Sequence, residues 1–525
     1  MRFIRTGQIS RPSLSAVLLL ATALLASGSA HAEPGVIITG KSPFADCDIA
    51  SEEGTNYLNA EVEPWIDVHP TNSKRLVAGW QQDRWSNGGS RSLMSAHSKD
   101  GGTSWKRVVV PGINKCSGGK GEFAYDRSSD PWTAVSPDGT SYFMSLSFMN
   151  DRPDGGMGAN AMLVSRSTDG GATWGAPQVL KRDTDGRAFN DKNAMTADPG
   201  NAKYVYATWD RLFDTTLPKS SAGSRADGTS HARERYRQGL LGKSQAEARG
   251  DYWTGPTYLA RTRDGGKNWE EARLIYDPGK YAQTIANQVV VLNDGSVLVF
   301  FTNITSKGLT SISFVRSNDR GTTFGSRKEA VATSVTLKGT RTPDSREPVR
   351  DGNILFDVAI DRETGYLYLV WQDGRDGGVD KVAFAMSTNG GNSWSTPVII
   401  SKTPPSESKF RTQAFIPSIE VGANSKLFVT YYDFRNDTEG TAKNEKTDYW
   451  LISCKPLKEN CKKASNWGHE KRLTAKSFNM LNAPIARGYF VGDYQGLVRQ
   501  GNGVRSLFGV TVGPGLNDMI TSYHE

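Results

Sequence analysis

One short pattern recurs five times along the 525-residue chain, and this repetition constrains the fold more than any other feature. The pattern reads Ser/Thr-x-Asp-x-Gly-x-x-Trp/Phe, with Asn in place of Asp in the last copy. The copies begin at Ser98, Ser167, Thr262, Ser317 and Ser387. Five copies of one local motif indicate that a single supersecondary unit is repeated within one body.

Each copy has the residues of a tight turn. The Asp or Asn side chain can accept backbone N–H bonds, the Gly can take positive φ, and the aromatic ring can pack under the hairpin. Strand-like runs such as residues 161–165 and 382–386 precede the copies, and residues 108–110 follow the first copy. We therefore predict turns between short strands, and we interpret the Asp residues as turn formers rather than catalytic groups.

These elements resemble the Asp-box repeats of sialidase-like β-propellers, and the resemblance covers most of the chain after residue 32. It implies an all-β ring of four-stranded blades. In such a ring each Asp box joins the third and fourth strands, on the face opposite the ligand site. Asp boxes also occur in propellers that are not sialidases, so the resemblance predicts the architecture better than the chemistry.

A second repeat counts the blades, because pairs of apolar runs separated by a turn occur seven times. The expected first strands lie at 65–68, 132–135, 194–197, 289–292, 355–360, 416–421 and 490–497. The expected second strands lie at 76–80, 142–147, 204–209, 297–302, 367–371, 427–432 and 506–512. We predict a single seven-bladed β-propeller over residues 33–525, closed by an N-terminal strand near residues 36–39. Six blades, the usual number in sialidases, remain the alternative.

The N-terminus has the pattern of an export signal. Three Arg residues precede an apolar run at 16–26 and a small-residue cleavage site at 30–32. Removal of residues 1–32 lowers the formal charge from +8 by those three Arg, and the remaining charge is too small to indicate nucleic-acid binding. We expect a periplasmic or extracellular protein with no membrane span and no nucleic-acid partner.

Four cysteines in an exported chain predict two disulfide bonds. Three pairings are open from the sequence. Cys454 and Cys461 are close enough in the chain to close a hairpin loop, and this choice pairs Cys47 with Cys116.

Strand order predicts which residues surround a ligand site. If the repeated turns lie at one end, first strands start and second strands finish at the other. The residues expected there ahead of first strands are Glu61, Glu63, Asp130, Asp191, Lys192, Gln288, Asn353, Gln413, Asp493 and Tyr494. Four second strands finish with an aromatic residue followed by Asp and Arg, which adds Asp83, Arg84, Asp210, Arg211, Asp373, Arg375, Asp433 and Arg435.

Two explanations fit this charge at one end of the ring. Each Asp can pair with its own or a neighbouring Arg and tie adjacent blades together. Alternatively, Arg84, Arg211, Arg375 and Arg435, with Lys192 and Gln288, bind a polar or anionic ligand through guanidinium forks.

The resemblance also implies catalytic roles. Sialidases use three arginines for the substrate carboxylate, an Asp as acid and base, and a Tyr nucleophile activated by a Glu. Tyr494 offers the phenol, and Glu61, Glu63, Asp130, Asp191 and Asp493 offer carboxylates. The family's Arg-Ile-Pro signature is absent, because the corresponding place reads Glu63-Pro64-Trp65.

We therefore expect a glycoside hydrolase that acts on a polar or anionic glycan, because two carboxyl groups with separated pKa values are sufficient for that chemistry. A non-catalytic glycan- or protein-binding propeller is the main rival, and a polysaccharide lyase ranks third. No cofactor or metal is predicted, and a monomer is expected. An insertion at about 213–251, rich in Lys and Arg, should rise over the ligand site.

Overall fold

The computed structural model describes residues 35–49, 54–150, 156–217, 252–331, 338–375, 377–438 and 440–525. These residues belong to one compact unit, Ala32–Glu525. The predicted export signal and residues 218–251 of the predicted insertion lie outside the described residues. Among the helices of the described residues, none has the length and apolar character needed to cross a membrane.

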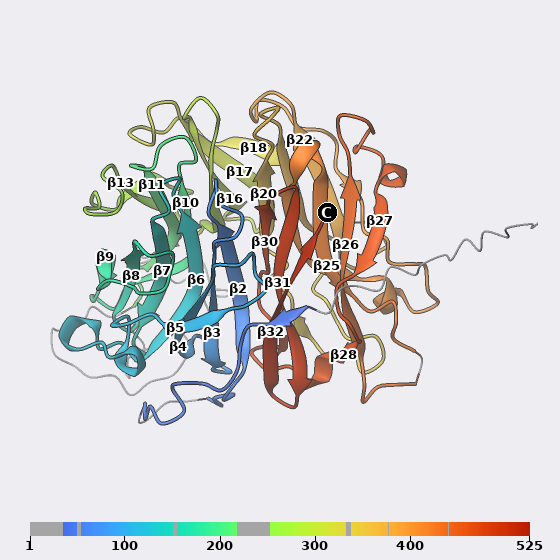
Figure 1. Ribbon diagram of the computed structural model, residues 1–525, viewed down its shortest axis with the longest axis horizontal. Helices are drawn as coiled ribbons and strands as arrows, with labels where there is room; N and C mark the ends of the chain where they lie inside the picture. The colour runs from blue at the N-terminus through green and yellow to red at the C-terminus, as the bar shows by residue number, and fades with distance from the viewer. Residues whose placement is uncertain are drawn as a thin grey trace, which may run out of the picture. The chain divides into compact units, whose positions relative to one another are not determined.

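Within these described ranges, strands form seven groups of four, and neighbours within a group are antiparallel (Figure 1). The first strands of the groups are β2 (Glu61–Val68), β6 (Arg127–Val135), β10 (Ala188–Ala197), β15 (Gln283–Val291), β20 (Phe356–Ile360), β24 (Ala414–Val421) and β30 (Gly496–Gln500). The second strands are β3 (Leu76–Arg84), β7 (Ser141–Phe148), β11 (Val205–Asp214), β16 (Val297–Ile304), β21 (Leu367–Asp373), β25 (Leu427–Asp433) and β31 (Gly503–Gly513). The second strands are almost continuously buried, which explains their apolar runs.

The outer half of each group is shorter and more exposed. The third strands are β4 (Ser90–Ser98), β8 (Asn160–Ser167), β13 (Thr257–Thr262), β17 (Thr310–Ser317), β22 (Lys381–Ser387), β26 (Lys446–Cys454) and β32 (Leu516–His524). The fourth strands are β5 (Lys106–Val109), β9 (Gln178–Asp183), β14 (Arg273–Tyr276), β18 (Lys328–Val331), β23 (Val398–Ile399), β27 (Gly468–Arg472) and β1 (Val36–Ile37).

A few short elements lie outside this plan. Two-residue strands β12 (Trp253–Thr254) and β28 (Phe478–Asn479) extend the third and sixth groups, and β19 (Val349–Arg350) pairs in parallel with β29 (Tyr489–Phe490). The short 3₁₀ helices are η1 (Lys115–Ser117), η2 (Gly121–Phe123), η3 (Lys409–Thr412), η4 (Ala423–Ser425), η5 (Ala464–Asn466) and η6 (Met480–Asn482). One backbone bridge, between Ser90 and Ser128, joins the first group to the second.

The predicted first strands of the first six groups coincide with observed strands, but the seventh does not. The predicted run 490–497 is interrupted, because Tyr489 and Phe490 pair with β19 and the first strand of the last group starts only at Gly496. The apolar character of Phe490 and Val491 comes from burial in two apolar clusters rather than from a ladder with β31.

The two ends of the groups are chemically distinct. The five repeated turns each follow a third strand, so they all lie at the end that we call the turn end. Second strands run antiparallel to third strands and finish at the opposite end, where Asp83, Asp210, Asp373 and Asp433 lie. Because first strands start there as well, their first residues share this end with those four Asp residues.

Each repeated turn is built from the same hydrogen bonds. In the first copy the Ser98 hydroxyl donates to Asp100 Oδ1 at 2.8 Å, and the N–H of Ser104 donates to the same oxygen at 2.9 Å. The N–H of Gly102 donates to the Ser98 Oγ at 2.8 Å. The other four copies repeat this arrangement. In these contacts the Asp or Asn side chain forms the turn, as predicted.

The turns also join one group to the preceding one. The carbonyl oxygen of the residue after Asp264 accepts a bond from Arg166 Nε of the second group at 2.7 Å. Equivalent carbonyls of the fourth and fifth turns accept from Arg261 and Arg316 of the groups before them. The carbonyl of Gly101, in the first group, accepts from Arg505 Nη2 of the last group at 2.7 Å. We call these four contacts the arginine brackets.

The N-terminal strand completes the last group, because Val36 and Ile37 pair with Thr521 and Ile520 of β32. Figure 1 shows the N-terminal β2 beside β30 and β31 from the end of the chain. Disulfides join Cys47 to Cys116 and Cys454 to Cys461, the pairings favoured by the sequence.

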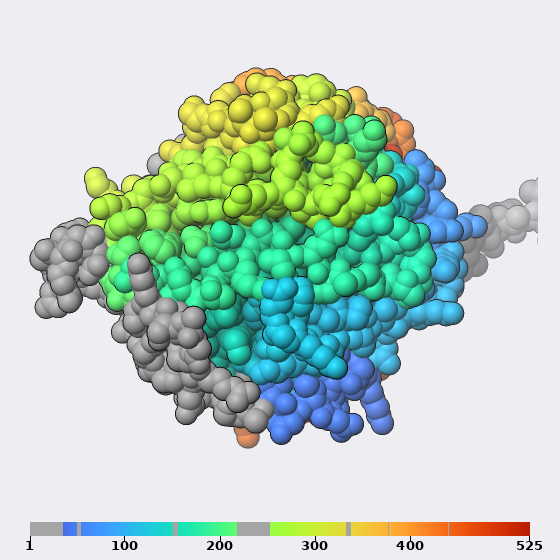
Figure 2. All heavy atoms as spheres, turned by 90° about the vertical axis from the view of Figure 1, so that its left-hand side faces the viewer, coloured from blue at the N-terminus to red at the C-terminus, as the bar shows by residue number. Residues whose placement is uncertain are grey.

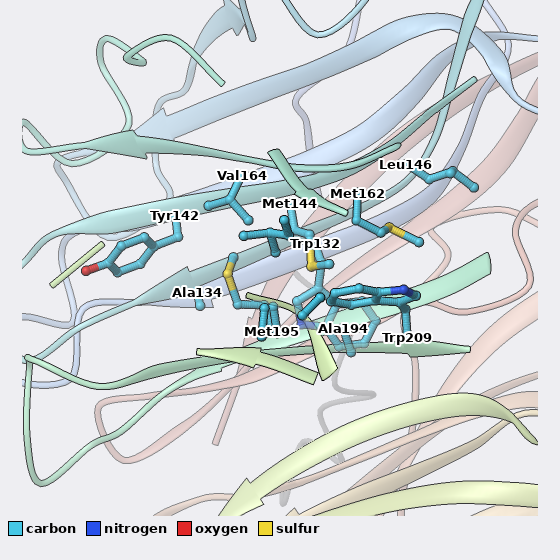
Figure 3. Close-up of a cluster of buried hydrophobic side chains, with 14 of the residues drawn as sticks. Trp132, Ala134, Tyr142, Met144, Leu146, Met162, Val164, Ala194, Met195 and Trp209 are labelled. Carbon is cyan, nitrogen blue, oxygen red and sulfur yellow. The ribbon is translucent and has the colours of Figure 1, made fainter. Parts of the chain in front are cut away.

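Apolar side chains fill the spaces between neighbouring groups. Between the second and third groups, Met144 and Met162 face Met195 and Trp209, and Trp132 lies among them (Figure 3). On the surface, consecutive chain segments form adjacent bands from blue through green to yellow (Figure 2). Sequential groups are therefore spatial neighbours.

Candidate functional site

Five of the first strands carry the same backbone irregularity near their starts. In each, two residues lie opposite one residue of the second strand, which defines a β-bulge. The first bulged residue has positive φ in every case, and these residues are Glu63, Asp130, Lys192, Ala286 and Ile416. Positive φ is uncommon outside glycine and costs about 1–3 kcal/mol, so the surrounding structure must hold these residues in place.

The bulges give the first three groups a charged residue at equivalent positions. The fourth and sixth groups have Ala286 and Ile416 there. Glycines with positive φ, Gly352 and Gly492, precede the first strands of the fifth and seventh groups. A Cβ atom on Gly352 would lie 2.3 Å from the Asp493 carbonyl oxygen, and one on Gly492 would lie 2.7 Å from the Glu63 nitrogen. These close approaches bring Asp493 next to the bulge residues.

A buried charged cluster results at the end opposite the turns, which we call the bulge end. It contains Glu63, Asp130, Lys192, Arg84, Arg350 and Asp493, with Asp191 beside Lys192. Glu63 is 1% exposed, Asp130 6% and Lys192 9%. Glu63 and Asp130 come from the predicted set, whereas Arg350 does not.

Arg350 holds the carboxylates of two different groups. Its Nε donates to Asp493 Oδ1 at 2.9 Å, its Nη2 donates to the other oxygen of Asp493, and Nη2 lies 3.9 Å from Glu63 Oε1. The Arg350 guanidinium lies 4.2 Å from the centre of the Phe490 ring, and the Arg84 guanidinium lies 4.8 Å from the same ring. Asp493 raises the pKa of Arg350 despite the opposing effect of burial, so this ion pair stays charged.

Glu63 and Asp130 form a carboxyl pair. Burial raises the pKa of Glu63 well above its ordinary range, and the charges of Asp130 and Asp493 raise it further. Burial and Asp191 raise the pKa of Asp130, whereas Lys192 and a hydrogen bond with Glu63 oppose that rise. The amide of Gln81 donates to Glu63 Oε2 and to the Ser129 hydroxyl. Burial and the neighbouring carboxylates therefore favour the protonated form of Glu63.

Lys192 is enclosed by aromatic rings. Its Nζ lies 3.8 Å from the ring centre of Tyr494 and 4.6 Å from that of Trp132, which stacks on Trp65 at 3.5 Å. Burial lowers the pKa of Lys192, and Asp130, Glu63 and Asp493 oppose that decrease.

Tyr494 lacks the properties of an activated nucleophile. Burial raises the pKa of its phenol well above the usual value, and the charges of Glu63 and Asp130 raise it further. Its hydroxyl donates to the Pro131 carbonyl at 3.4 Å. A tyrosine nucleophile, and equally a tyrosine base for a lyase, needs the opposite shift.

Three of the predicted ligand-binding arginines are held outside the cluster. Arg211 pairs with Asp183 of β9 at 2.6 Å, Arg375 with Asp373, and Arg435 with both Asp433 and Glu470 at 2.6 and 2.7 Å. These pairs correspond to the structural explanation of the repeated Asp and Arg residues, although Arg211 bonds to an outer strand rather than to Asp210.

Two further predicted residues, Gln288 and Glu61, make hydrogen bonds to residues outside the cluster. Gln288 donates to the Phe356 carbonyl at 2.8 Å and links two first strands. Glu61 bonds to Gln82 rather than to the cluster, and burial raises the pKa of Glu61 to about 9.

Sequence reasoning missed Arg350, Gln81 and Ser129. Arg350 stands two residues before the positive-φ Gly352, as Glu61 stands two residues before Glu63. Alignment of the groups on their bulges would have found it, whereas alignment on apolar strands did not.

Two hollows lie along the first strands. A small cavity of about 20 Å³ at the bulge end is lined by Lys192, Asp493, Tyr494, Trp65 and Trp132, among others. A larger cavity of about 620 Å³ lies at the turn end and is lined by all seven first strands. Trp65, Trp132, Gln288 and Asp357 line both cavities and so separate them.

One acidic group has a geometry that suits a metal ion. Asp344, Asp437 and Glu445 bring carboxylate oxygens within 4.8 Å of one another. The guanidinium of Arg411 already bonds to both Asp344 and Asp437, and backbone N–H groups bond to all three carboxylates. This cluster is satisfied by the chain itself.

Comparisons with known proteins reach only solved structures, because no protein family model and no curated protein matches the chain. The intramolecular trans-sialidase from Ruminococcus gnavus is 12% identical, with 92% of this chain and 98% of that chain covered and a TM-score of 0.44. The Hadza microbial sialidase Hz136 is 14% identical over 71% of this chain, with a TM-score of 0.42. Only 64% of the Hz136 chain is covered, which is less than two thirds of its length. An α-L-arabinanase from Penicillium chrysogenum is 13% identical, with coverages of 76% and 93% and a TM-score of 0.41. Solved structures similar to the chain thus include sialidases, the class that its sequence resembles. At this level of similarity, their activities are not assigned to the chain.

Proposed function

We propose that the chain is an exported, seven-bladed, sialidase-like propeller with glycoside hydrolase activity at its bulge end. The ring is supported by the seven four-stranded groups, by the contact from Arg505 of the last group to Gly101 of the first, and by the cavity lined by all seven first strands. In this proposal the repeated turns are Asp boxes, and β1 closes the ring.

The observation that carries the activity is the convergence of Glu63, Asp130 and Asp493 in one buried cluster, where burial raises the pKa of Glu63 and Asp493 pairs with Arg350. Glycosidases need one carboxyl group that keeps a proton and one that is ionised. We assign the proton donor to the Glu63–Asp130 pair. We assign the ionised carboxylate to Asp493, because Arg350 stabilises its charge.

The mutual influence of Glu63 and Asp130 on their pKa values argues against one division of roles. Two carboxyl groups that flank a glycosidic bond stand at least about 5 Å apart. Glu63 and Asp130 therefore act as one acid, and the second carboxylate is Asp493 rather than either member of the pair.

Hydrolysis of chromogenic glycosides and polysaccharides tests the proposal. We expect Asp130→Asn and Glu63→Gln to lower the rate at least about 100-fold, the usual contribution of general acid catalysis. Asp169→Asn, in a repeated turn at the other end, is the matched control and should retain the rate within about twofold. Equal rates in all variants, or no turnover by the wild-type protein on any substrate, would refute the hydrolase.

Non-catalytic binding of a glycan or a protein is the second candidate, and the small size of the cavity at the bulge end favours it over catalysis. The Asp373–Arg375 and Asp433–Arg435 pairs neutralise the ends of two second strands, and the cavity beside Lys192 has a volume of only about 20 Å³. Saturable binding of a glycan without turnover, abolished by Asp493→Asn, would support this reading.

We also propose that residues 1–32 are an export signal, and we retain the insertion at 213–251 as part of the propeller's third group. Two disulfides suit an oxidising compartment, either the periplasm or the outside of the cell. Appearance of the mature N-terminus near residue 33 in a periplasmic or culture fraction would test the signal.

A further inference from the structure

We infer that one surface loop docks the protein on a lipid bilayer that carries anionic headgroups. The loop comprises residues 455–467, which join β26 to β27, and we call it the lysine loop. It lies at the turn end, because it follows a third strand. Docking through this loop leaves the bulge end free to face water, so the inference is independent of the hydrolase proposed there.

The lysine loop takes the place of a repeated turn. In each of the first five groups, one of the repeated turns follows the third strand, whereas in the sixth group the lysine loop follows β26. The loop contains no Asp and no Gly, so the residues that form the other turns are missing from it. A different sequence at an equivalent position indicates a different role for this loop.

Uncompensated positive charge is the first argument. The loop contains Lys455, Lys458, Lys462 and Lys463 against the single acid Glu459, a net charge of +3 in a chain of formal net charge +8. All four lysines are exposed. Glu459 Oε2 accepts a hydrogen bond from the backbone N–H of Lys455 at 3.1 Å. Within the part of the chain that the structure describes, none of the four lysines forms an ion pair.

A fifth lysine extends this charge. Lys426 lies in the turn between β24 and β25, which is also at the turn end. Burial lowers the pKa of Lys426, the positive charge of Lys455 lowers it further, and Glu525 opposes the decrease. Like charges at this spacing repel one another, and an anionic surface relieves that repulsion. Each lysine beside a bilayer of anionic lipids strengthens binding about fivefold.

An apolar side chain among the lysines distinguishes a bilayer from a soluble polyanion. Leu457 lies between Lys455 and Lys458 and is 57% exposed, more than any other large hydrophobic residue that the structure describes. The boundary between headgroups and acyl chains accepts an apolar side chain while the headgroups attract the lysines. A soluble polyanion offers no such apolar layer. The combination therefore favours a bilayer.

The lysine loop is held in one conformation before it binds. The disulfide between Cys454 and Cys461 closes its first half. In its second half, Nε1 of the buried Trp467 donates to the Cys461 carbonyl at 2.9 Å, and Lys402 Nζ donates to the Ala464 carbonyl at 2.6 Å. A surface fixed in this way loses little conformational entropy on docking.

Sedimentation of the purified full chain with lipid vesicles tests the inference. One set of vesicles is phosphatidylcholine alone, and the other contains equal parts of phosphatidylcholine and phosphatidylglycerol. We expect at least about tenfold tighter binding to the anionic vesicles, because several lysines contribute together. High salt should weaken this binding, since it screens exposed charges.

Two lysines of the loop are then removed with a matched control. Lys458→Ala combined with Lys462→Ala should lower the affinity for anionic vesicles at least about tenfold. Lys203→Ala combined with Lys267→Ala removes the same charge from exposed lysines of the third group, also at the turn end. This control should change the affinity less than about twofold, because distant exposed charges are screened.

The leucine has its own control. Leu457→Ser should lower the affinity for anionic vesicles at least about threefold and leave binding to dextran sulfate, a soluble polyanion, unchanged. Leu309→Ser, at a leucine that is 51% exposed in the turn between β16 and β17, should change neither. Circular dichroism checks that each variant is folded.

Three results would overturn the inference. They are no preference for anionic vesicles, equal losses in the loop lysines and their controls, and a Leu457→Ser variant that binds anionic vesicles as tightly as the wild-type protein. The last result together with tight binding of dextran sulfate would assign the loop to a soluble polyanion. If a variant does not fold, the two vesicle types decide with the wild-type protein alone. Failure of the hydrolase would leave the docking result unchanged, because no substitution here lies at the bulge-end cluster.

Discussion

Carboxyl groups of the repeated turns and of the bulge end are held in opposite states. At the turn end, hydrogen bonds from Ser104 lower the pKa of Asp100 to about 2, and the N–H of Asn268 does the same for Asp264. Both side chains are in contact with water. At the bulge end, burial raises the pKa values of Glu63 and Asp130. Both regions contain residues with positive φ, and the backbone geometry of each recurs in several groups.

The difference teaches that a repeated backbone geometry does not define the chemistry of its side chains. In the turns, N–H and hydroxyl donors stabilise an ionised carboxylate that remains hydrated. At the bulges, the same kind of group is removed from water and surrounded by other charges. The turns therefore suit a structural role, and the bulges suit proton transfer.

The largest expected effect on this comparison comes from removal of Lys192, the cation at the centre of the bulge end. Lys192→Met leaves Glu63, Asp130 and Asp493 without their shared positive charge, and removal of one partner from a buried ionic network costs about 3–5 kcal/mol. Urea denaturation at pH 7 measures the free energy of unfolding. Lys181→Met, at a half-buried lysine of β9, should change it by less than about 0.5 kcal/mol. A loss below 1 kcal/mol for Lys192→Met would contradict the account.

At the turn end, a substitution can disrupt the packing of a repeated turn against the preceding group. Gly266 has φ of 75°, and an added Cβ would lie 2.4 Å from Cε1 of Tyr142. We expect Gly266→Ala to lower the free energy of unfolding by about 2–4 kcal/mol, as backbone strain and overpacking add. The control is Gly308→Ala, at φ of 76° with no atom within 4 Å of the new Cβ, and its cost should be only about 1 kcal/mol. Equal losses would show that the turn does not pack tightly on its neighbour.

Opposite pH slopes would sharpen the comparison between buried and hydrated carboxyl groups, with Asp67 as the buried one although it lines the cavity at the turn end. Burial raises the pKa of Asp67, in β2, to about 7, so the folded state binds more protons than the unfolded state between about pH 4 and 7. Stability supplied by that proton is present at low pH and is lost as the pH rises through 7. We expect Asp67→Asn to reduce this pH-dependent loss of unfolding free energy by about 1–2 kcal/mol. The value is smaller than the full pKa shift implies, because Asp67 lines an open cavity.

Asp264→Asn is the opposing variant for that experiment. Because its folded pKa of about 2 lies below the unfolded value, Asp264 contributes stability above about pH 4 that is lost as the pH falls to 2. Thermal unfolding between pH 2 and 8 measures both slopes. The same slope change in the two variants would be inconsistent with opposite pKa shifts.

The smallest expected effect comes from making the turns uniform. Asn389 is the only amide among the five turn carboxyl positions, and its Nδ2 donates to Ser393 Oγ at 2.8 Å. Asn389→Asp should reverse that bond and raise the free energy of unfolding by about 0.5 kcal/mol at neutral pH. The gain should vanish near pH 2. A destabilised variant at pH 7 would mean that the fifth turn differs from the other four.

Local motifs made much of the fold predictable. The repeated turns follow third strands as expected, because their hydrogen bonds are internal to an eight-residue segment. The seventh first strand was wrong, since Phe490 and Val491 are apolar for reasons of packing, and only long-range pairing with β19 distinguishes them from a ladder strand.

The site was less predictable than the fold. Glu63, Asp130, Lys192 and Asp493 were found because strand order identifies one end of the groups. Arg350 was missed, and the pairing of Arg211 with Asp183 was not foreseen, because the partner of a long side chain depends on three-dimensional neighbours that no local pattern encodes.

The arginine brackets have a consequence for how such chains change over evolutionary time. Each bracket reaches only the adjacent group and ends on a main-chain oxygen, which every residue possesses. Duplication or deletion of one whole unit would therefore preserve a joint wherever the preceding unit keeps its Arg, whatever residue supplies the main-chain oxygen. A chain built in this way can vary its number of repeats more readily than the register within any one of them.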